Sequence, residues 1–253
     1  MQQLKKLPPK HILKILTVLL LILGLALAAA GCGEPEDEGQ ATPPQEEDPA
    51  VGPGEGGSGE EPVDYEALGV NEAGEIMVLM YHEIGEPEDE WVRTPENFRK
   101  DLQELYDAGY RAVSMNDVLD GRIDIPAGTT PVVLTFDDGR AGQFRYIEKE
   151  GELVMDPDCA VAILEEFYEA HPDFGLAATF YLFYSGVPFG QPDLVQKKLD
   201  YLVERGFEIG NHTNSHPNLR NLSREAAIKD IALMVKKTQE YLPGYQVRSL
   251  ALP

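Results

Sequence analysis

The chain has 253 residues, of which 43% are hydrophobic, so it is long enough for one large domain or two small ones. It carries 44 acidic against 21 basic residues, which gives a formal net charge of −23. Because nucleic-acid-binding proteins neutralise phosphates with Lys and Arg, this charge argues against nucleic acid as a partner.

The N-terminal residues have the pattern of an export signal. Four lysines in the first fourteen residues precede an apolar run over 15–30. This run is shorter than the ~20 residues of a full membrane span, which disfavours an uncleaved anchor. The motif AAGC at 29–32 resembles a bacterial lipobox, although Ala replaces the usual Leu three places before Cys32. We expect residues 1–32 to be a signal peptide and Cys32 to be lipidated, which would anchor the exported protein on the extracellular side of the membrane. Simple secretion and a signal anchor are the alternatives.

Residues 33–72 are rich in Glu, Pro and Gly and show no apolar period. From Gly33 to Glu75 there are fourteen acidic and no basic residues. Such a segment buries too little apolar surface to offset its ordering entropy, so we expect a disordered acidic linker. The remaining residues, 73–253, would form the folded domain.

From Glu75 onward, strand-like and helix-like segments alternate. Strands are predicted over 76–82, 111–115, 131–139, 176–183, 207–212 and 247–252. Helices are predicted over 94–109, 115–121, 156–172, 191–206 and 223–244. Thr94 and Ser223 are expected as N-caps, Gly109 and Gly244 as C-caps, and Asp156-Pro157 as a helix start. The segment 140–156 would be an insertion that forms a small hairpin.

This alternation predicts a parallel α/β sheet or barrel. The apolar runs MVLM at 77–80 and VVL at 132–134 are typical of parallel strands that are buried on both faces. The only cysteine besides Cys32 is Cys159, which lies at helical spacing and is expected to be a buried small hydrophobe. With Cys32 lipidated, Cys159 would have no disulfide partner.

Polar residues stand at the ends of three predicted strands. They are Tyr81 and His82, Asp137 and Asp138, and His212 and His216. The carboxyl ends of parallel strands meet at one edge of a sheet, where sites gather. Two histidines and one carboxylate suit a catalytic divalent metal such as zinc. Ordinary loop histidines and an Asp-Gly turn are the alternatives.

The motifs TFDDG at 135–139 and HTNSH at 212–216 together resemble the first two motifs of the polysaccharide deacetylases, the NodB-homology carbohydrate esterases. The segments VLMYH, ATFY and GFEIGN, which begin at residues 78, 178 and 206, also resemble that family. The resemblance covers most of 76–253 and implies a distorted (β/α) barrel.

By that resemblance, Asp138, His212 and His216 would hold one divalent metal, with zinc first and cobalt, nickel or manganese as alternatives. Asp137 would be the general base. Amide hydrolysis needs an activated water, and a metal lowers the pKa of water from ~15.7 towards ~7. Tyr81 and His82 could line the site or serve the structure. Asn211 and Thr213, beside the ligands, are expected to form the turn or to support the ligands.

The segment RSLALP at 248–253 resembles the start of the family's third motif and makes Arg248 a candidate for lining the site. In the family, an oxyanion-hole amide, an Asp-containing motif and a late Leu-x-His motif follow this point. We therefore expect a barrel truncated at its C-terminal side, from a fragment or a truncated gene product, with weak or absent turnover.

The expected activity is metal-dependent removal of acetyl groups from N-acetylhexosamine units of a cell-envelope or extracellular polysaccharide. The family resemblance slightly favours poly-N-acetylglucosamine over peptidoglycan. An O-acetyl esterase of the xylan type would use the same site. A catalytically impaired, metal-containing glycan-binding module is the alternative from another class. A metallophosphoesterase would need more metal ligands and often a second metal ion, and the anionic surface of the chain disfavours this function.

Overall fold

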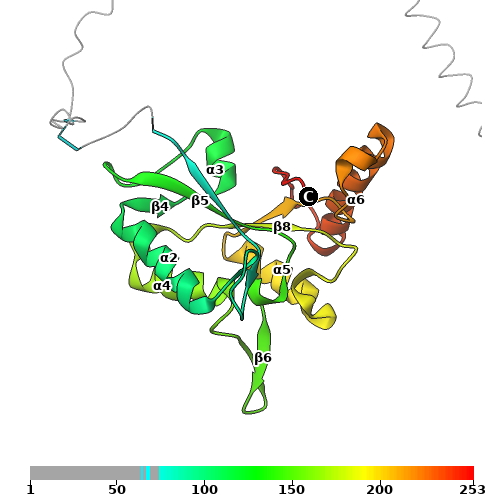
Figure 1. Ribbon diagram of the computed structural model, residues 1–253, viewed down its shortest axis with the longest axis horizontal. Helices are drawn as coiled ribbons and strands as arrows, with labels where there is room; N and C mark the ends of the chain where they lie inside the picture. Colours follow the sequence, from blue (N-terminus) through cyan, green and yellow to red (C-terminus); the bar gives the residue numbers. More distant parts are fainter. Residues whose placement is uncertain (1–63, 65–66, 69–73) are drawn as a thin grey trace, which may run out of the picture. The chain divides into compact units, whose positions relative to one another are not determined.

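The structure is a computed structural model that describes residues 64, 67–68 and 74–253 (Figure 1). The expected signal peptide at 1–32 lies outside the described residues, as do Cys32 and all of the expected linker except residues 64, 67 and 68. Within the described part of the chain, no helix combines the length and the apolar character that a membrane crossing requires.

A five-stranded sheet lies at the centre of the domain, and all of its strand pairs are parallel. Its strands are β1 (Met77–Tyr81), β4 (Tyr110–Ala112), β5 (Thr130–Phe136), β8 (Thr179–Leu182) and β9 (Glu208–Asn211). The order is β1-β5-β8-β9, and β4 pairs with the first part of β5 while β8 pairs with its end. The predicted class, a mixed α/β fold with a parallel sheet, is confirmed. Over the described residues this sheet is open and is not closed into a barrel.

Five α-helices and five short 3₁₀ turns connect the strands in the described part of the chain. The helices are α2 (Pro95–Asp107), α3 (Met115–Asp120), α4 (Ala160–Ala170), α5 (Val195–Glu204) and α6 (Arg224–Tyr241). The 3₁₀ turns are η1 (Ala141–Gln143), η2 (Pro172–Phe174), η3 (Pro188–Gly190), η4 (Pro192–Leu194) and η5 (Leu219–Asn221). Thr94 and Ser223 are N-caps as predicted, because each side chain accepts a hydrogen bond from a backbone N–H of the first turn.

The core lies between one face of the sheet and helices α2, α4 and α5, which are drawn below the sheet in Figure 1. Its fully buried members include Val132, Leu134 and Phe136 of β5, Phe98 and Leu102 of α2, and Leu199 of α5. The rings of Phe136 and Phe180 stack with centroids 5.0 Å apart, which joins β5 to β8. A rigid, well-packed β5 therefore supports whatever follows its last residue.

The prediction that β1 is buried on both faces is wrong. Val78 and Met80 are 52% and 57% exposed, whereas the alternate residues Met77 and Leu79 pack on the core. β1 lies at one end of the sheet, and only the face that bears Met77 and Leu79 packs on the core. The same prediction for β5 is confirmed, since Val132, Val133 and Leu134 are fully buried.

Three other predictions need correction. The segment 247–252 is not a regular strand, because its only ladder contact is an isolated parallel bridge from Leu250 to Asn211. Helix α4 begins at Ala160, since Asp156 forms a turn by accepting the backbone N–H groups of Asp158 and Cys159. The C-caps are Ala108 and Leu242, and the predicted glycines follow them in the left-handed conformation.

Two small additions extend from the sheet. The predicted insertion forms an antiparallel hairpin of β6 (Tyr146–Lys149) and β7 (Glu152–Met155), which projects downward in Figure 1. The loop after β1 contains β2 (Glu83–Ile84) paired in parallel with β3 (Val92–Arg93). Cys159 is fully buried, as predicted.

Candidate metal centre

The turn after β5 presents two adjacent carboxylates at the carboxyl edge of the sheet. The backbone N–H of Asp137 still donates to Tyr81 O of β1 at 2.9 Å, so this residue continues the strand pairing. Asp138 then adopts a left-handed φ of 73° and Gly139 one of 61°. Glycine suits this left-handed position, and a Cβ there would lie 2.8 Å from a methyl group of Leu182. The reversal puts two mostly buried carboxylates, 4% and 7% exposed, beside each other.

A second turn, after β9, presents the two histidines. Asn211 Oδ1 accepts the backbone N–H of Thr213 at 2.7 Å, and Thr213 Oγ1 accepts that of His216 at 3.1 Å. Thr213 and His216 both have left-handed φ angles, of 62° and 51°. Asn211 and Thr213 therefore shape the turn, as expected from the sequence.

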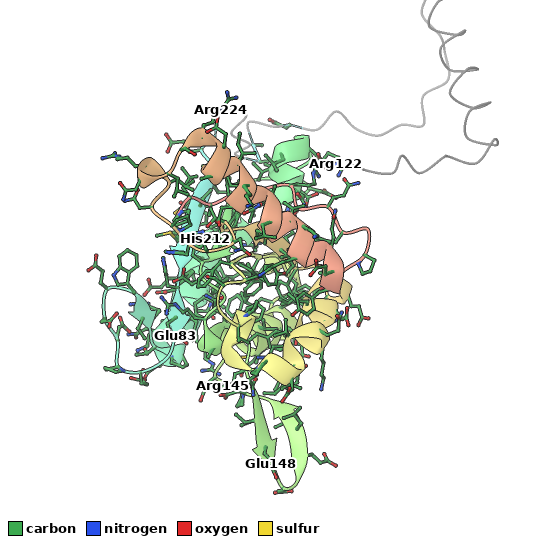
Figure 2. The ribbon with its side chains drawn as sticks, turned by 90° about the vertical axis from the view of Figure 1, so that its right-hand side faces the viewer. Glu83, Arg122, Arg145, Glu148, His212 and Arg224 are labelled. Carbon is green, nitrogen blue, oxygen red and sulfur yellow. The ribbon has the colours of Figure 1, made fainter. Side chains whose placement is uncertain are left out.

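Asp230 on α6 holds this turn from outside, and it was not predicted from the sequence. Its carboxylate accepts the backbone N–H groups of Asn214 at 2.8 Å and Ser215 at 3.0 Å, and the Ser215 hydroxyl at 2.8 Å. Partial burial opposes the charge, but these hydrogen bonds hold the pKa of Asp230 below its usual range. Figure 2 looks onto α6, with His212 labelled beside it. The sequence around Asp230 does not indicate that it holds this turn, because acidic residues are common on exposed helix faces.

The two turns bring Asp138, His212 and His216 together. Asp138 Oδ1 lies 3.5 Å from His212 Nε2 and 3.1 Å from His216 Nε2. One ligand atom from each residue lies within 4.8 Å of the others. His212 Nδ1 is 3.0 Å from Ala251 O, so in the neutral ring Nδ1 donates and Nε2 points its lone pair at Asp138.

The donor set fits a divalent cation. Asp138 Oδ1 is buried and makes no hydrogen bond within the described part of the chain, so lone pairs from the carboxylate and the two rings converge. Two imidazole nitrogens and one carboxylate oxygen are zinc-type ligands. The carbonyl on His212 Nδ1 is the outer partner that metal-bound histidines usually have.

The charges at the site are coupled. The imidazole of His212 and then the guanidinium of Arg140 hold the pKa of Asp138 well below its usual range. Burial opposes the cationic form of His212, yet Asp138 and Asp137 raise the pKa of its ring. Burial raises the pKa of Asp137, and the neighbouring histidines oppose that rise. Asp137 Oδ1 is also buried without a hydrogen bond from the described residues, so it is free to accept a proton.

A cavity of ≈ 450 Å³ opens over these side chains. Asp137, Asp138, His212, His216 and His82 line it together with Trp91, which was not predicted from the sequence. The signal for Trp91 was that it is the only tryptophan of the chain and lies shortly after the Tyr-His pair.

The other two candidates do not line this cavity. The Tyr81 hydroxyl donates to Asp101 at 3.2 Å, the Tyr81 ring packs on Phe98 and Phe136, and the residue lines an adjoining cavity. The Arg248 guanidinium pairs with Asp120 at 2.5–3.0 Å and is not among the residues that line the cavity.

The fold and the site define a class of protein, namely those with a parallel α/β sheet and a candidate divalent-metal site at its carboxyl edge. The family model "Polysaccharide deacetylase" matches residues 124–253. The chain belongs to the polysaccharide deacetylase family, which places it among the hydrolases, as the two sequence motifs indicated. This family generally uses a divalent metal ion.

Solved structures agree with this fold. The deacetylase PplD of Streptococcus pyogenes, solved with acetate, is 22% identical with a TM-score of 0.52, covering 70% of this chain and 72% of that protein. A polysaccharide deacetylase of Bacillus cereus is 22% identical with a TM-score of 0.50. That match covers 69% of this chain but 49% of the Bacillus protein, so this chain spans about half of its length. A comparison with curated protein sequences gave no match.

Proposed function

We propose that the protein removes acetyl groups from N-acetylhexosamine units of a cell-envelope or extracellular polysaccharide, in a reaction that depends on a divalent metal. The observation that carries the proposal is the convergence of Asp138, His212 and His216 beside a second carboxylate, Asp137, in one cavity. Membership of the family supports the reaction class.

The residues have separate tasks in this proposal. Asp138, His212 and His216 would hold zinc, or alternatively cobalt, nickel or manganese. When bound, the ion supplies Lewis acidity that lowers the pKa of a water molecule and polarises an acetyl carbonyl. Asp137 accepts the proton of the attacking water at its free Oδ1. Asp138 does not compete for that proton, because its carboxylate would be among the ligands of the metal.

The proposal includes the organisation of the chain. Residues 1–32 act as an export signal, a lipid on Cys32 holds the protein at the outer side of the membrane, and residues 33–72 form the linker. The domain over 73–253 then reaches the polysaccharide. The lysines, apolar run and lipobox-like motif support this organisation.

The test is acetate release from N-acetylglucosamine oligomers by the full chain loaded with zinc or cobalt. Asp137→Asn should lower turnover by ~10²–10⁴-fold, the usual contribution of a general base, while metal content stays at the wild-type level. Asp138→Asn should lose the metal. Asp200→Asn, a matched change on the exposed side of α5, should behave as wild type.

Two outcomes would contradict the proposal. Metal-dependent binding of the oligomers without acetate release from wild type would identify a glycan-binding module. Faster acetate release from acetylated xylan than from the oligomers would identify an O-acetyl esterase.

A further inference from the structure

The loop between β1 and α2 folds back on itself and ends beside the metal-ligand cavity. Glu83 N donates to Trp91 O, and Gly85 N donates to Arg93 O, each at 3.0 Å. Asp89 Oδ1 accepts the backbone N–H of Trp91 at 2.8 Å. The backbone of Trp91 is therefore fixed from both sides, although the residue lies in a loop.

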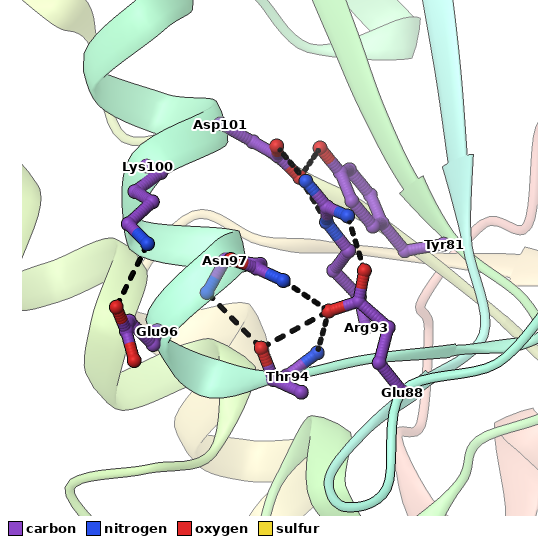
Figure 3. A network of polar contacts seen from close by, with 8 residues as sticks. All are labelled: Tyr81, Glu88, Arg93, Thr94, Glu96, Asn97, Lys100 and Asp101. Carbon is purple, nitrogen blue, oxygen red and sulfur yellow. Dashed lines mark hydrogen bonds and ion pairs between the residues drawn. The ribbon is translucent and has the colours of Figure 1, made fainter.

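A polar network attaches this loop to the start of α2 (Figure 3). Arg93 donates to both oxygens of Asp101, at 2.8 and 2.5 Å, and to Glu88 at 2.6 Å. Glu88 also accepts hydrogen bonds from Thr94 and Asn97. Because Arg93 is bidentate to one carboxylate and bridges to another, the loop has a defined position before any ligand arrives.

Trp91 is 54% exposed, although backbone hydrogen bonds fix its place in the loop. The edge contact with the His82 ring, at a centroid distance of 4.7 Å, sets its orientation. Trp91 lines the cavity of the metal ligands and also an adjoining cavity of ≈ 270 Å³. His82 and Met80 are shared by the two cavities in the same way, so Trp91 stands at the boundary between them.

We propose that Trp91 is a stacking platform for the pyranose ring next to the acetylated unit, so that the adjoining cavity is a second sugar subsite. This inference rests on the proposed function. The face of a pyranose ring presents C–H groups, which pack on the electron-rich face of an indole. An exposed, rigid aromatic beside a reaction site supplies contact area with little loss of conformational entropy.

The charge of the loop limits which sugar it can receive. The loop carries five acidic residues, of which Glu88, Asp89 and Glu90 line the adjoining cavity. Its only Lys or Arg is Arg93, which the network occupies. Like charges repel, so a uronic acid is disfavoured at this subsite. A neutral N-acetylhexosamine, or the amine that deacetylation produces, is compatible with it.

The chain offers a direct probe, because Trp91 is its only tryptophan. Intrinsic tryptophan fluorescence of the zinc-loaded Asp137→Asn variant would be titrated with N-acetylglucosamine and its oligomers. We expect a saturable change in emission with the oligomers, a weaker one with the monomer, and none with oligogalacturonate. If the emission did not change at a saturating concentration of oligomer, the stacking role of Trp91 would be refuted. An equal response to oligogalacturonate would overturn the charge argument.

Kinetics give a second readout. In Trp91→Ala, the KM for oligomers should rise about tenfold more than the KM for a small acetate ester, while Trp91→Phe should retain most of the affinity. Leu119→Ala removes a similarly exposed apolar side chain, 53% exposed on α3 away from the cavities, and should match wild type.

Failure of the inference and failure of the proposed function are distinct. Acetate release with equal oligomer KM values for wild type and Trp91→Ala would refute the subsite alone. If wild type released no acetate but its tryptophan emission still changed saturably with the oligomers, the proposed deacetylase activity would be refuted. The contact between Trp91 and the sugar would stand.

Discussion

Replacing Asp230 by alanine tests whether α6 positions the candidate metal ligands. Asp230 makes no hydrogen bond with Asp138 or a histidine ring, yet it accepts three hydrogen bonds from the turn that carries His212 and His216. That turn contains two non-glycine residues with left-handed φ angles, a conformation that persists only when its surroundings fix it. We expect Asp230→Ala to loosen the turn and to weaken metal binding.

The size of the effect follows from the contacts. A hydrogen bond to a charged group contributes ~1.5–3 kcal/mol. The turn is partly exposed, so we take the lower value for the two backbone N–H bonds and neglect the hydroxyl, which gives about 3 kcal/mol. Since each ~1.4 kcal/mol is a factor of ten, zinc affinity should fall by about 100-fold. The usual loss on removing an outer partner of a metal ligand, ~10–100-fold, agrees with this value.

Zinc affinity would be measured by competition with a chromophoric chelator, and global stability by urea titration of the same samples. Asp230→Asn keeps the acceptor oxygen and should lose less affinity than Asp230→Ala. Glu240→Ala removes an exposed carboxylate from the same helix and should bind zinc as wild type does. If Asp230→Ala bound zinc as tightly as wild type while remaining folded, the positioning role of Asp230 would be refuted.

Two further predictions concern the fold. Burial lowers the pKa of the fully buried Lys198 to about 8, from the usual 10.5. Between pH 8 and 10.5 the unfolded chain therefore binds more protons at Lys198 than the folded chain does. Raising the pH through this range should stabilise wild type by up to ~3 kcal/mol relative to Lys198→Met. Urea titrations across this range check it, and a pH-independent difference would contradict it. Gly210→Ala should prevent folding, as judged by circular dichroism, because its Cβ would lie 2.3 Å from the Tyr181 ring, whereas Gly85→Ala should fold normally.

The local parts of the structure were predictable from the sequence. The run VVL at 132–134 is buried as predicted, because a central strand between helices and neighbouring strands needs apolar residues on both faces. The same reasoning failed for β1, since exposure there depends on strand order, which no local pattern contains. Likewise, the segment 247–252 has the composition of a strand, but a strand also needs a partner along its length.

In the candidate site, too, the residues in local motifs could be predicted, whereas those whose role depends on the packing of distant segments could not. Asp138, His212 and His216 could be predicted because their types and spacing belong to short motifs. Asp230 could not, because its role depends on how α6 docks against a turn sixteen residues earlier. Arg248 was a candidate because its segment resembles the family's third motif, and in the structure its guanidinium pairs with Asp120 of α3, a contact that the motif does not contain.

The left-handed conformations of Asp138 and His216 have a consequence for protein engineering. Both residues occupy backbone positions where glycine or asparagine would be more comfortable, so they carry strain that a substitution could release. A screen that selects variants for heat resistance alone would favour substitutions at these two positions, and the resulting proteins would lack two of the candidate metal ligands. Thermostabilisation of this domain therefore has to leave both turns untouched and work on the rest of the scaffold.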